Sequence, residues 1–227
     1  MTERVLSKQE ISQRILDAVG FVDELSREVG TLLDELYDSL RVDGEEPLLL
    51  ERQLLPAPKR KHGSNASSYY DNHKALVLLY GSDAEDAGEA GEDDDDVEQV
   101  KPGAGIDITT DSSLLGIIVR LLEPNKAKAT GFVPCVMAAY LTNLTRQLKG
   151  KKASAGSQKD FKLKRRQLLS LFWEIEPDTK PEQQVSCRVL KGHLVGTVAG
   201  FACQHLVEFD SEKAVADFAA VIQEMLH

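Results

Sequence analysis

Residues 7–41, SKQEISQRILDAVGFVDELSREVGTLLDELYDSLR, carry the clearest structural signal in the chain. Apolar residues recur there at alternating spacings of four and three, with charged residues between them. This heptad pattern predicts one long amphipathic helix that ends near Val42. Ser7 and Glu10 have the spacing of a capping box, in which each side chain bonds a backbone N–H group of the first turn.

The apolar seam of this helix has two interpretations. Either it packs on the chain's own domain, as the inner face of an amphipathic helix does, or it forms a coiled coil with a second copy or another protein. The second interpretation predicts a partner interface made by Ile11, Ile15, Val22, Leu25, Val29, Leu32 and Leu36. We therefore divide the chain into an N-terminal helix for packing or oligomerisation, residues 1–42, and an α+β body, residues 43–227.

The net charge of the 227-residue chain is −10, and one segment accounts for all of it. Residues 83–98 hold ten acidic residues and no lysine or arginine, so the remainder is neutral. The consecutive aspartates lack the staggered spacing of a calcium loop, and the glycines around them favour flexibility over the fixed charges of a nucleic-acid mimic. Blocks of like charge are typical of disordered segments. The sequence therefore predicts a disordered acidic insert at about residues 82–105.

The body contains signals for strands and for helices. A short apolar run at 74–81 ends in glycine and predicts a buried strand. The run at 113–122 suits either a helix capped by Asp111 or a buried strand. Over 133–150 the apolar residues have helical spacing before a terminal glycine, and we expect a helix there.

The C-terminal part adds a hairpin and a last helix. Strand and helix patterns overlap at 161–175, and we expect a strand in the second half of that stretch. A hairpin is predicted to turn at Lys191-Gly192. Asp210-Ser211 predicts the cap of a C-terminal helix. The expected inner face of that helix holds Val215, Phe218, Ala219 and Ile222. The sum is an α+β fold with a long N-terminal amphipathic helix, a small, mainly antiparallel sheet and a C-terminal helix.

A basic stretch at 146–166 holds nine basic residues against one acid, for a net charge of +8. Such a stretch suits a solvated surface, a counter-charge for the acidic insert, or binding of phosphate backbones. Nucleic-acid binding is thus the alternative function, with the acidic insert as an intramolecular competitor. The predicted nucleic-acid-binding residues are Lys149, Lys151, Lys152, Lys159, Lys162, Lys164, Arg165 and Arg166.

Residue types that bind zinc gather near the C-terminus, at Cys187, His193, Cys203 and His205. Their spacing matches no compact zinc module, so we expect no metal ion and interpret the cysteines as small apolar residues.

Chemistry at other motifs has little support. Gly192, Gly196 and Gly200 do not have the spacing of a phosphate-binding loop, and glycines in a hairpin favour bulges or close backbone approach. Glu176 and Asp178 make a metal-dependent hydrolase a second alternative. We otherwise expect no catalytic residue and no cofactor.

The remaining observations bear on location and function. Three cysteines without a CxxC pair do not predict a disulfide framework. The charged N-terminus lacks the apolar core of a secretory signal, and no run of 18 apolar residues is present to span a membrane. We expect a cytoplasmic protein that binds no membrane. The heptad seam predicts a non-enzymatic interaction or accessory protein, assembling through its N-terminal helix with a protein partner or as a homo-oligomer.

Overall fold

The structure is a computed structural model that describes residues 8–40, 47–52, 74–81, 105–121, 133–148, 160–189 and 192–227. Its elements, in chain order, are α1 (Lys8–Leu40), β1 (Leu48–Arg52), β2 (Lys74–Tyr80), β3 (Gly105–Ile108), β4 (Ser113–Arg120), β5 (Cys135–Leu148), β6 (Phe161–Lys164), α2 (Arg165–Leu169), the 3₁₀ helix η3 (Ser170–Glu174), β7 (Gln184–Val189), β8 (Gly192–His205), the 3₁₀ helix η4 (Leu206–Glu208) and α3 (Glu212–Leu226). The acidic insert lies outside the described residues except for Gly105, which is the first residue of β3. The residues or side chains described also exclude the capping pair Ser7 and Glu10, and Lys149, Lys151, Lys152 and Lys159.

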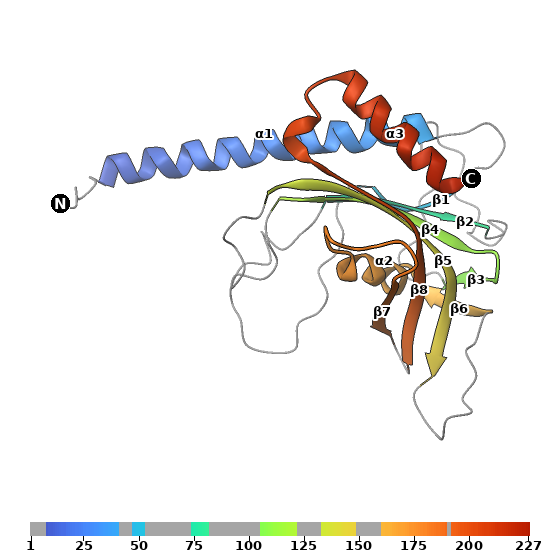
Figure 1. The fold of residues 1–227 in the computed structure, drawn as a ribbon. Helices are drawn as coiled ribbons and strands as arrows, with labels where there is room; N and C mark the ends of the chain where they lie inside the picture. Colours follow the sequence, from blue (N-terminus) through green and yellow to red (C-terminus); the bar gives the residue numbers. More distant parts are fainter. Residues whose placement is uncertain are drawn as a thin grey trace, which may run out of the picture.

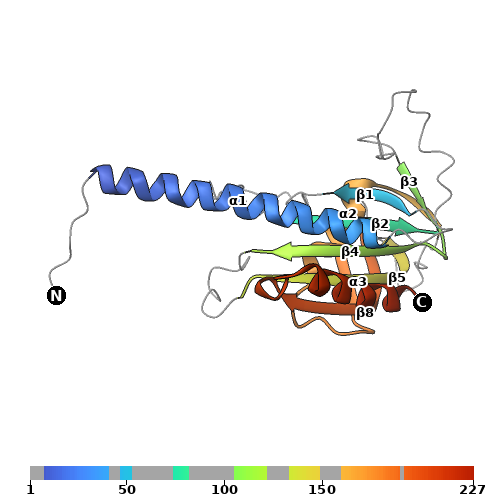
Figure 2. The same cartoon turned by 90° about the horizontal axis from the view of Figure 1, so that it is seen from above.

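A sheet is the centre of the described part of the chain. Six strands pair antiparallel in the order β1-β2-β4-β5-β8-β7. Helices α1 and α3 lie on one face, while α2, η3 and a two-stranded sheet of β3 and β6 lie on the other (Figures 1 and 2). The fold is therefore α+β and mainly antiparallel, and its sheet is larger than the small one predicted.

Both faces of the sheet are covered, and β4 shows the consequence for the sequence. Leu115, Ile117 and Val119 belong to the core under α1 and α3, whereas Leu114 and Ile118 belong to the core under α2 and η3. A strand buried on both faces has a nearly continuous apolar sequence. The ambiguous run at 113–122 thus forms a strand.

The structure corrects the helix predicted over 133–150, because this segment forms strand β5. Val136 and Ala138 face the helices, and Met137 and Ala139 face the opposite layer. Because β5 is buried on both faces, apolar residues occupy successive positions along it. Such a sequence contains the helical spacing as well as the alternating spacing of a strand. Pairing with β4 and β8 overrides the helix preference of the alanines, methionine and leucines.

The prediction for 161–175 is also wrong, since the strand comes first and the helical turns follow. Segment β6 ends at Lys164, and α2 and η3 continue to Glu174. Leu168, Leu171 and Phe172 are buried from these turns. Their spacing of three and four is the helical pattern. A segment that packs on the sheet with one side only buries residues at this spacing when it is helical.

Five other predictions are confirmed, the hairpin with a shifted turn. Helix α1 spans 33 residues, β2 is a buried strand, and β7 and β8 form a hairpin. The predicted turn at Lys191-Gly192 is corrected in one respect, because Gly192 belongs to β8 and pairs with Val189. Ser211 caps α3, with its hydroxyl accepting a bond from the backbone N–H of Ala214. The buried face of α3 is the predicted one, Val215, Phe218, Ala219 and Ile222.

Glycines of β8 mark irregularities in its pairing with β5, as expected. The register shifts twice, once beside Gly200 and once opposite Gly196. The second shift contains Asn143, whose φ of 51° lies in the left-handed region that asparagine tolerates better than most residues. Gly200 also admits α3 closely, because a Cβ built on it would lie 2.7 Å from Met225 Cγ.

Candidate functional site

Helix α1 has two unlike halves. Its N-terminal half, residues 8–24, extends beyond the sheet (Figures 1 and 2). Every described side chain between residues 13 and 24 is exposed, including Leu16 at 65%. We call residues 8–24 the overhang. The side chains of the predicted interface residues Ile11, Ile15 and Val22 are outside the part that the structure describes.

The C-terminal half of α1 packs on the chain's own core. Val29, Leu32 and Leu36 of the predicted interface are buried, and Leu25 is partly buried beside them. They share this core with the sheet and with α3. Gln223 of α3 donates a hydrogen bond to the carbonyl oxygen of Ser39, 2.9 Å away. This bond joins the two helices near their C-terminal ends.

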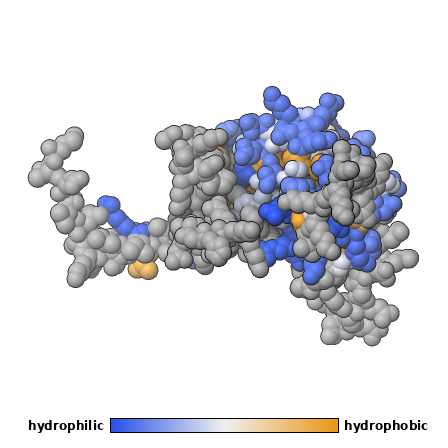
Figure 3. All heavy atoms as spheres, turned by 90° about the horizontal axis from the view of Figure 1, so that it is seen from below, coloured by the Kyte–Doolittle hydropathy of each residue, from blue (hydrophilic) through white to orange (hydrophobic). Residues whose placement is uncertain are grey.

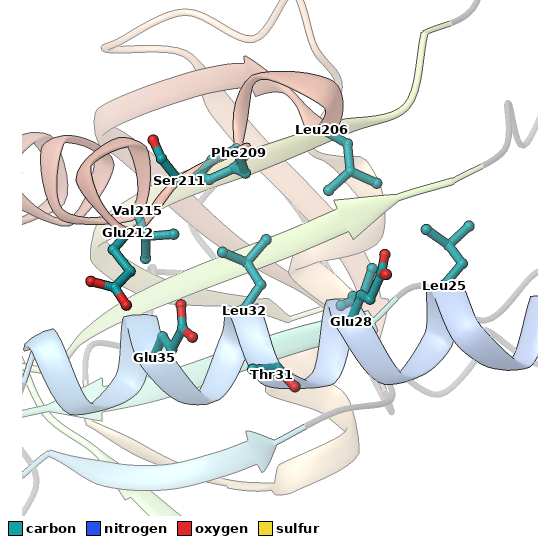
Figure 4. A pocket seen from close by; sticks show the side chains of 11 residues that line it. Leu25, Glu28, Thr31, Leu32, Glu35, Leu206, Phe209, Ser211, Glu212 and Val215 are labelled. Atoms are coloured by element: carbon teal, nitrogen blue, oxygen red, sulfur yellow. The ribbon is translucent and has the colours of Figure 1, made fainter.

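A groove of about 330 Å³ opens between α1 and the segment from η4 to the start of α3. We call it the acidic groove. Its residues from α1 are Leu25, Glu28, Val29, Thr31, Leu32 and Glu35, and those from the other side are Leu206, Phe209, Ser211, Glu212 and Val215. Figure 4 shows Leu25 and Leu206 at one end of the groove and Leu32 directed toward Val215. The floor is therefore apolar.

The far wall of the groove is fixed by local contacts. The backbone N–H of Leu206 bonds the carbonyl oxygen of Pro134 at 2.8 Å, which secures η4 to the start of β5. The Phe209 ring packs edge-on against Phe218 of α3, with ring centres 5.2 Å apart. Edge-to-face packing of this kind is favourable for aromatic pairs. The corner between η4 and α3 is thus built into the core.

Charge on the groove has one sign. Glu28, Glu35 and Glu212 are exposed lining residues, and the carboxylates of Glu35 and Glu212 point toward each other (Figure 4). No lysine or arginine is among the described residues that line it. Three carboxylates around an apolar floor create a negative potential that favours a cationic ligand.

The described part of the predicted nucleic-acid surface is partly neutralised. Lys162 forms an ion pair with Asp107 at 2.9 Å, and Arg165 forms one with Glu51 at 2.8 Å. Lys164 and Arg166 are exposed beside them. These residues lie on the side opposite α1 and α3, where the visible described surface is mostly hydrophilic (Figure 3). Since Lys162 and Arg165 are engaged in the chain itself, nucleic-acid binding stays a prediction.

The predicted zinc-type residues do not converge. Cys187 and His193 lie near the turn of the β7–β8 hairpin, whereas Cys203 and His205 lie at the other end of β8. Ten residues of strand separate His193 from Cys203, a distance of about 30 Å. Within the described ranges, no three His, Cys, Asp or Glu side chains gather as a metal site requires.

Cys187 gives a pH-dependent prediction instead. Burial and the charge of Glu174 raise the pKa of its thiol from 9.0 to about 12. The thiol is neutral in both states below pH 9, but between pH 9 and 12 only the unfolded chain loses the proton, so stability falls as pH rises. We expect wild type to lose about 2 kcal/mol more than Cys187→Ala between about pH 8 and 10.5 in urea unfolding. Equal losses in both proteins would contradict this.

The carboxylates of the hydrolase alternative lie on a closed turn. The backbone N–H of Glu176 bonds the hydroxyl of Thr179 at 2.9 Å, and the N–H of Thr179 bonds the carbonyl oxygen of Glu176 at the same distance. Thr179 is buried, while Glu176 and Asp178 are exposed. This arrangement accounts for the turn and offers no support for a metal site.

Fold and groove together define an α+β protein in which a long helix covers one face of an antiparallel sheet and extends beyond it. No protein family, curated protein or solved structure matches the chain. None of the helices that the structure describes has the length and apolarity to cross a membrane.

Sequence reasoning found one wall of the groove and missed the other. The seam residues Leu25, Val29 and Leu32 line it, as does Val215, which was predicted to be on the inner face of α3. Leu206 and Phe209 were not predicted, because they lie in a short turn without periodicity. A weak signal is present in the sequence: the apolar residue Phe209 directly precedes the Asp210-Ser211 pair, near the position where a hydrophobic residue commonly packs on the first turn of a helix.

Proposed function

We propose that the chain is a non-enzymatic interaction or accessory protein of the cytoplasm, and that it assembles with a second copy or another protein through the N-terminal part of α1. The overhang carries this proposal. An isolated helical segment of its length is marginally stable in water. A partner that covers the predicted seam supplies the missing packing.

Two further observations support the proposal. The heptad spacing continues from the buried residues Val29 and Leu32 into the overhang, so one seam serves the core at one end and a partner at the other. The three cysteines, all within the described part, form no disulfide, which suits a reducing compartment.

Deletion of residues 1–22 tests the proposed function. We expect the truncated chain to lose self-association in sedimentation velocity, or partner capture in pull-downs, because the predicted seam residues Ile11, Ile15 and Val22 are gone. Its free energy of unfolding is expected to change by less than about 1 kcal/mol, because the described side chains removed are exposed. The deletion spares the buried half of α1.

A matched control separates the seam from the rest of the overhang. Leu16 is exposed and lies off the heptad seam. Leu16→Glu is therefore expected to preserve assembly, whereas Ile15→Glu is expected to abolish it. Unchanged sedimentation and pull-down behaviour in the truncated protein would overturn the proposed function.

A further inference from the structure

We infer that the acidic groove and the adjoining overhang bind one amphipathic helix of a partner protein, with an apolar stripe flanked by lysine or arginine. This inference rests on the proposed function and specifies the partner. It follows from the shape of the groove, the charge of its rim and the charge of α1.

Shape favours a helix as the ligand. Leu25, Val29 and Leu32 line the groove from α1 at spacings of four and three, so its apolar floor follows one face of a helix. Val29 and Leu32 are buried and form that floor, while the partly exposed Leu25 is open to a ligand. An elongated apolar groove of this kind suits the apolar stripe of an amphipathic helix. The opposite wall adds Leu206 and Phe209. Val207, between those two residues, has 78% of its surface exposed, so apolar surface continues past the wall.

Length favours a helix that also follows the overhang. The groove extends along α1 from Leu25 to Glu35, about 15 Å, and residues 8–24 add about 25 Å in the same direction. The heptad spacing is unbroken between the two parts. A partner helix of about 27 residues matches the combined length.

Charge favours a basic partner over a second copy. Helix α1 contains eight acidic and three basic residues between Lys8 and Leu40, so two such helices side by side repel each other. The rim carboxylates of Glu28, Glu35 and Glu212 add to that repulsion. Lysine or arginine flanking an apolar stripe complements the same surface, and complementary charge selects partners at interfaces.

Two synthetic peptides, each about 21 residues or three heptads long, test the inference against the full-length protein. Both have leucine at the seam positions; one has lysine and the other glutamate at the flanking positions. In fluorescence anisotropy at about 50 mM salt we expect the lysine peptide to bind at least about tenfold more tightly. The preference is expected to shrink at about 300 mM salt, because salt screens exposed charges.

Charge reversal at the rim provides the decisive variant. The combined Glu28→Lys, Glu35→Lys and Glu212→Lys protein is expected to reverse the preference and bind the glutamate peptide more tightly. A matched control makes the same change in net charge at exposed acids that do not line the groove. Its substitutions are Asp38→Lys, Glu176→Lys and Asp178→Lys. This control is expected to keep the preference for the lysine peptide.

Each other outcome overturns the inference. Equal binding of the two peptides, binding of neither, or equal effects of the rim and control reversals would show that the groove does not select a basic helix. A wild-type dimer in sedimentation that the rim reversal strengthens would identify a second copy as the occupant. If truncation of residues 1–22 abolishes assembly while the peptides show no preference, only this inference fails. If truncation leaves assembly intact, the proposed function itself fails.

Discussion

Gly116→Ala is expected to lower the free energy of unfolding by about 3 kcal/mol, the upper range for overpacked cores. Gly116 lies in the central strand β4, where a Cβ would be 2.2 Å from Phe172 Cε1 and 2.4 Å from its Cδ1. Phe172 is fully buried in η3 and cannot turn outward. The strand or η3 must therefore shift to admit one methyl group.

Urea unfolding measures this effect, with the fluorescence of Trp173 as the signal. Trp173 is the single tryptophan of the chain and directly follows Phe172, so it reports on the layer that Gly116 supports. We expect a lower transition midpoint with an unchanged dependence on urea, since the unfolded chain is not altered in compactness. A loss below about 1 kcal/mol would contradict the proposed packing.

Two controls isolate the clash. Gly196→Ala places a methyl group in the same sheet 3.2 Å from Leu144 Cδ2, the end of a flexible side chain, and is expected to change stability by no more than about 1 kcal/mol. In a double-mutant cycle, Phe172→Leu is expected to reduce the cost of Gly116→Ala by more than about 1 kcal/mol. Additive effects would mean that the ring is not the obstacle.

The helices of the fold were more predictable from the sequence than its central strands. Helices α1 and α3 each pack one face on the sheet, so their periodicity could be read from the sequence. In contrast, β4 and β5 are buried on both faces, and nothing in their apolar sequences separates a strand from a buried helix. Pairing of β4 with β2, and of β5 with β8, makes these two segments strands. Such pairing joins residues far apart in the sequence, so it cannot be inferred from either segment alone.

Prediction of the groove was limited in another way. The heptad seam on α1 and the inner face of α3 were each visible, but their contact depends on residues far apart, as in the bond from Gln223 to Ser39 across 184 positions. From its spacing alone, the whole seam suits packing on the chain's own domain or contact with a partner. The structure shows packing for Val29, Leu32 and Leu36, which no spacing rule distinguishes from the positions before Leu25.

Arg120→Ala is expected to lower the free energy of unfolding by about 3 kcal/mol, whereas Arg120→Met is expected to cost about 1 kcal/mol. Arg120, at the end of β4, is only 2% exposed, and its Nη2 donates a hydrogen bond to the carbonyl oxygen of Ile175. That bond ties the residue after η3 to the sheet. Alanine removes the donor and leaves a cavity, while methionine removes the donor and fills most of the space.

Opposing effects set the size of the methionine result. Losing the donor leaves the Ile175 carbonyl oxygen without this bond, at a cost of about 1–3 kcal/mol. Removing a buried charge returns part of its desolvation cost, which is why apolar replacements of buried ions are often tolerated. Urea unfolding of both variants measures the balance. Equal losses for alanine and methionine would show that packing volume at this position contributes nothing.

A second readout distinguishes the charge of Arg120 from its packing. Burial raises the pKa of the Cys203 thiol, and the neighbouring Cys135 and the charge of Arg120 partly oppose that rise. Arg120→Met is therefore expected to raise this pKa further and to slow alkylation of Cys203 at about pH 8, because the thiolate is the reactive form. A general loss of stability has the opposite effect, since transient opening exposes the buried Cys135 and Cys187 and speeds total alkylation. Slower labelling of Cys203 in a less stable protein thus separates the electrostatic role of Arg120 from the structural one, and faster labelling at all three cysteines would leave only the structural role.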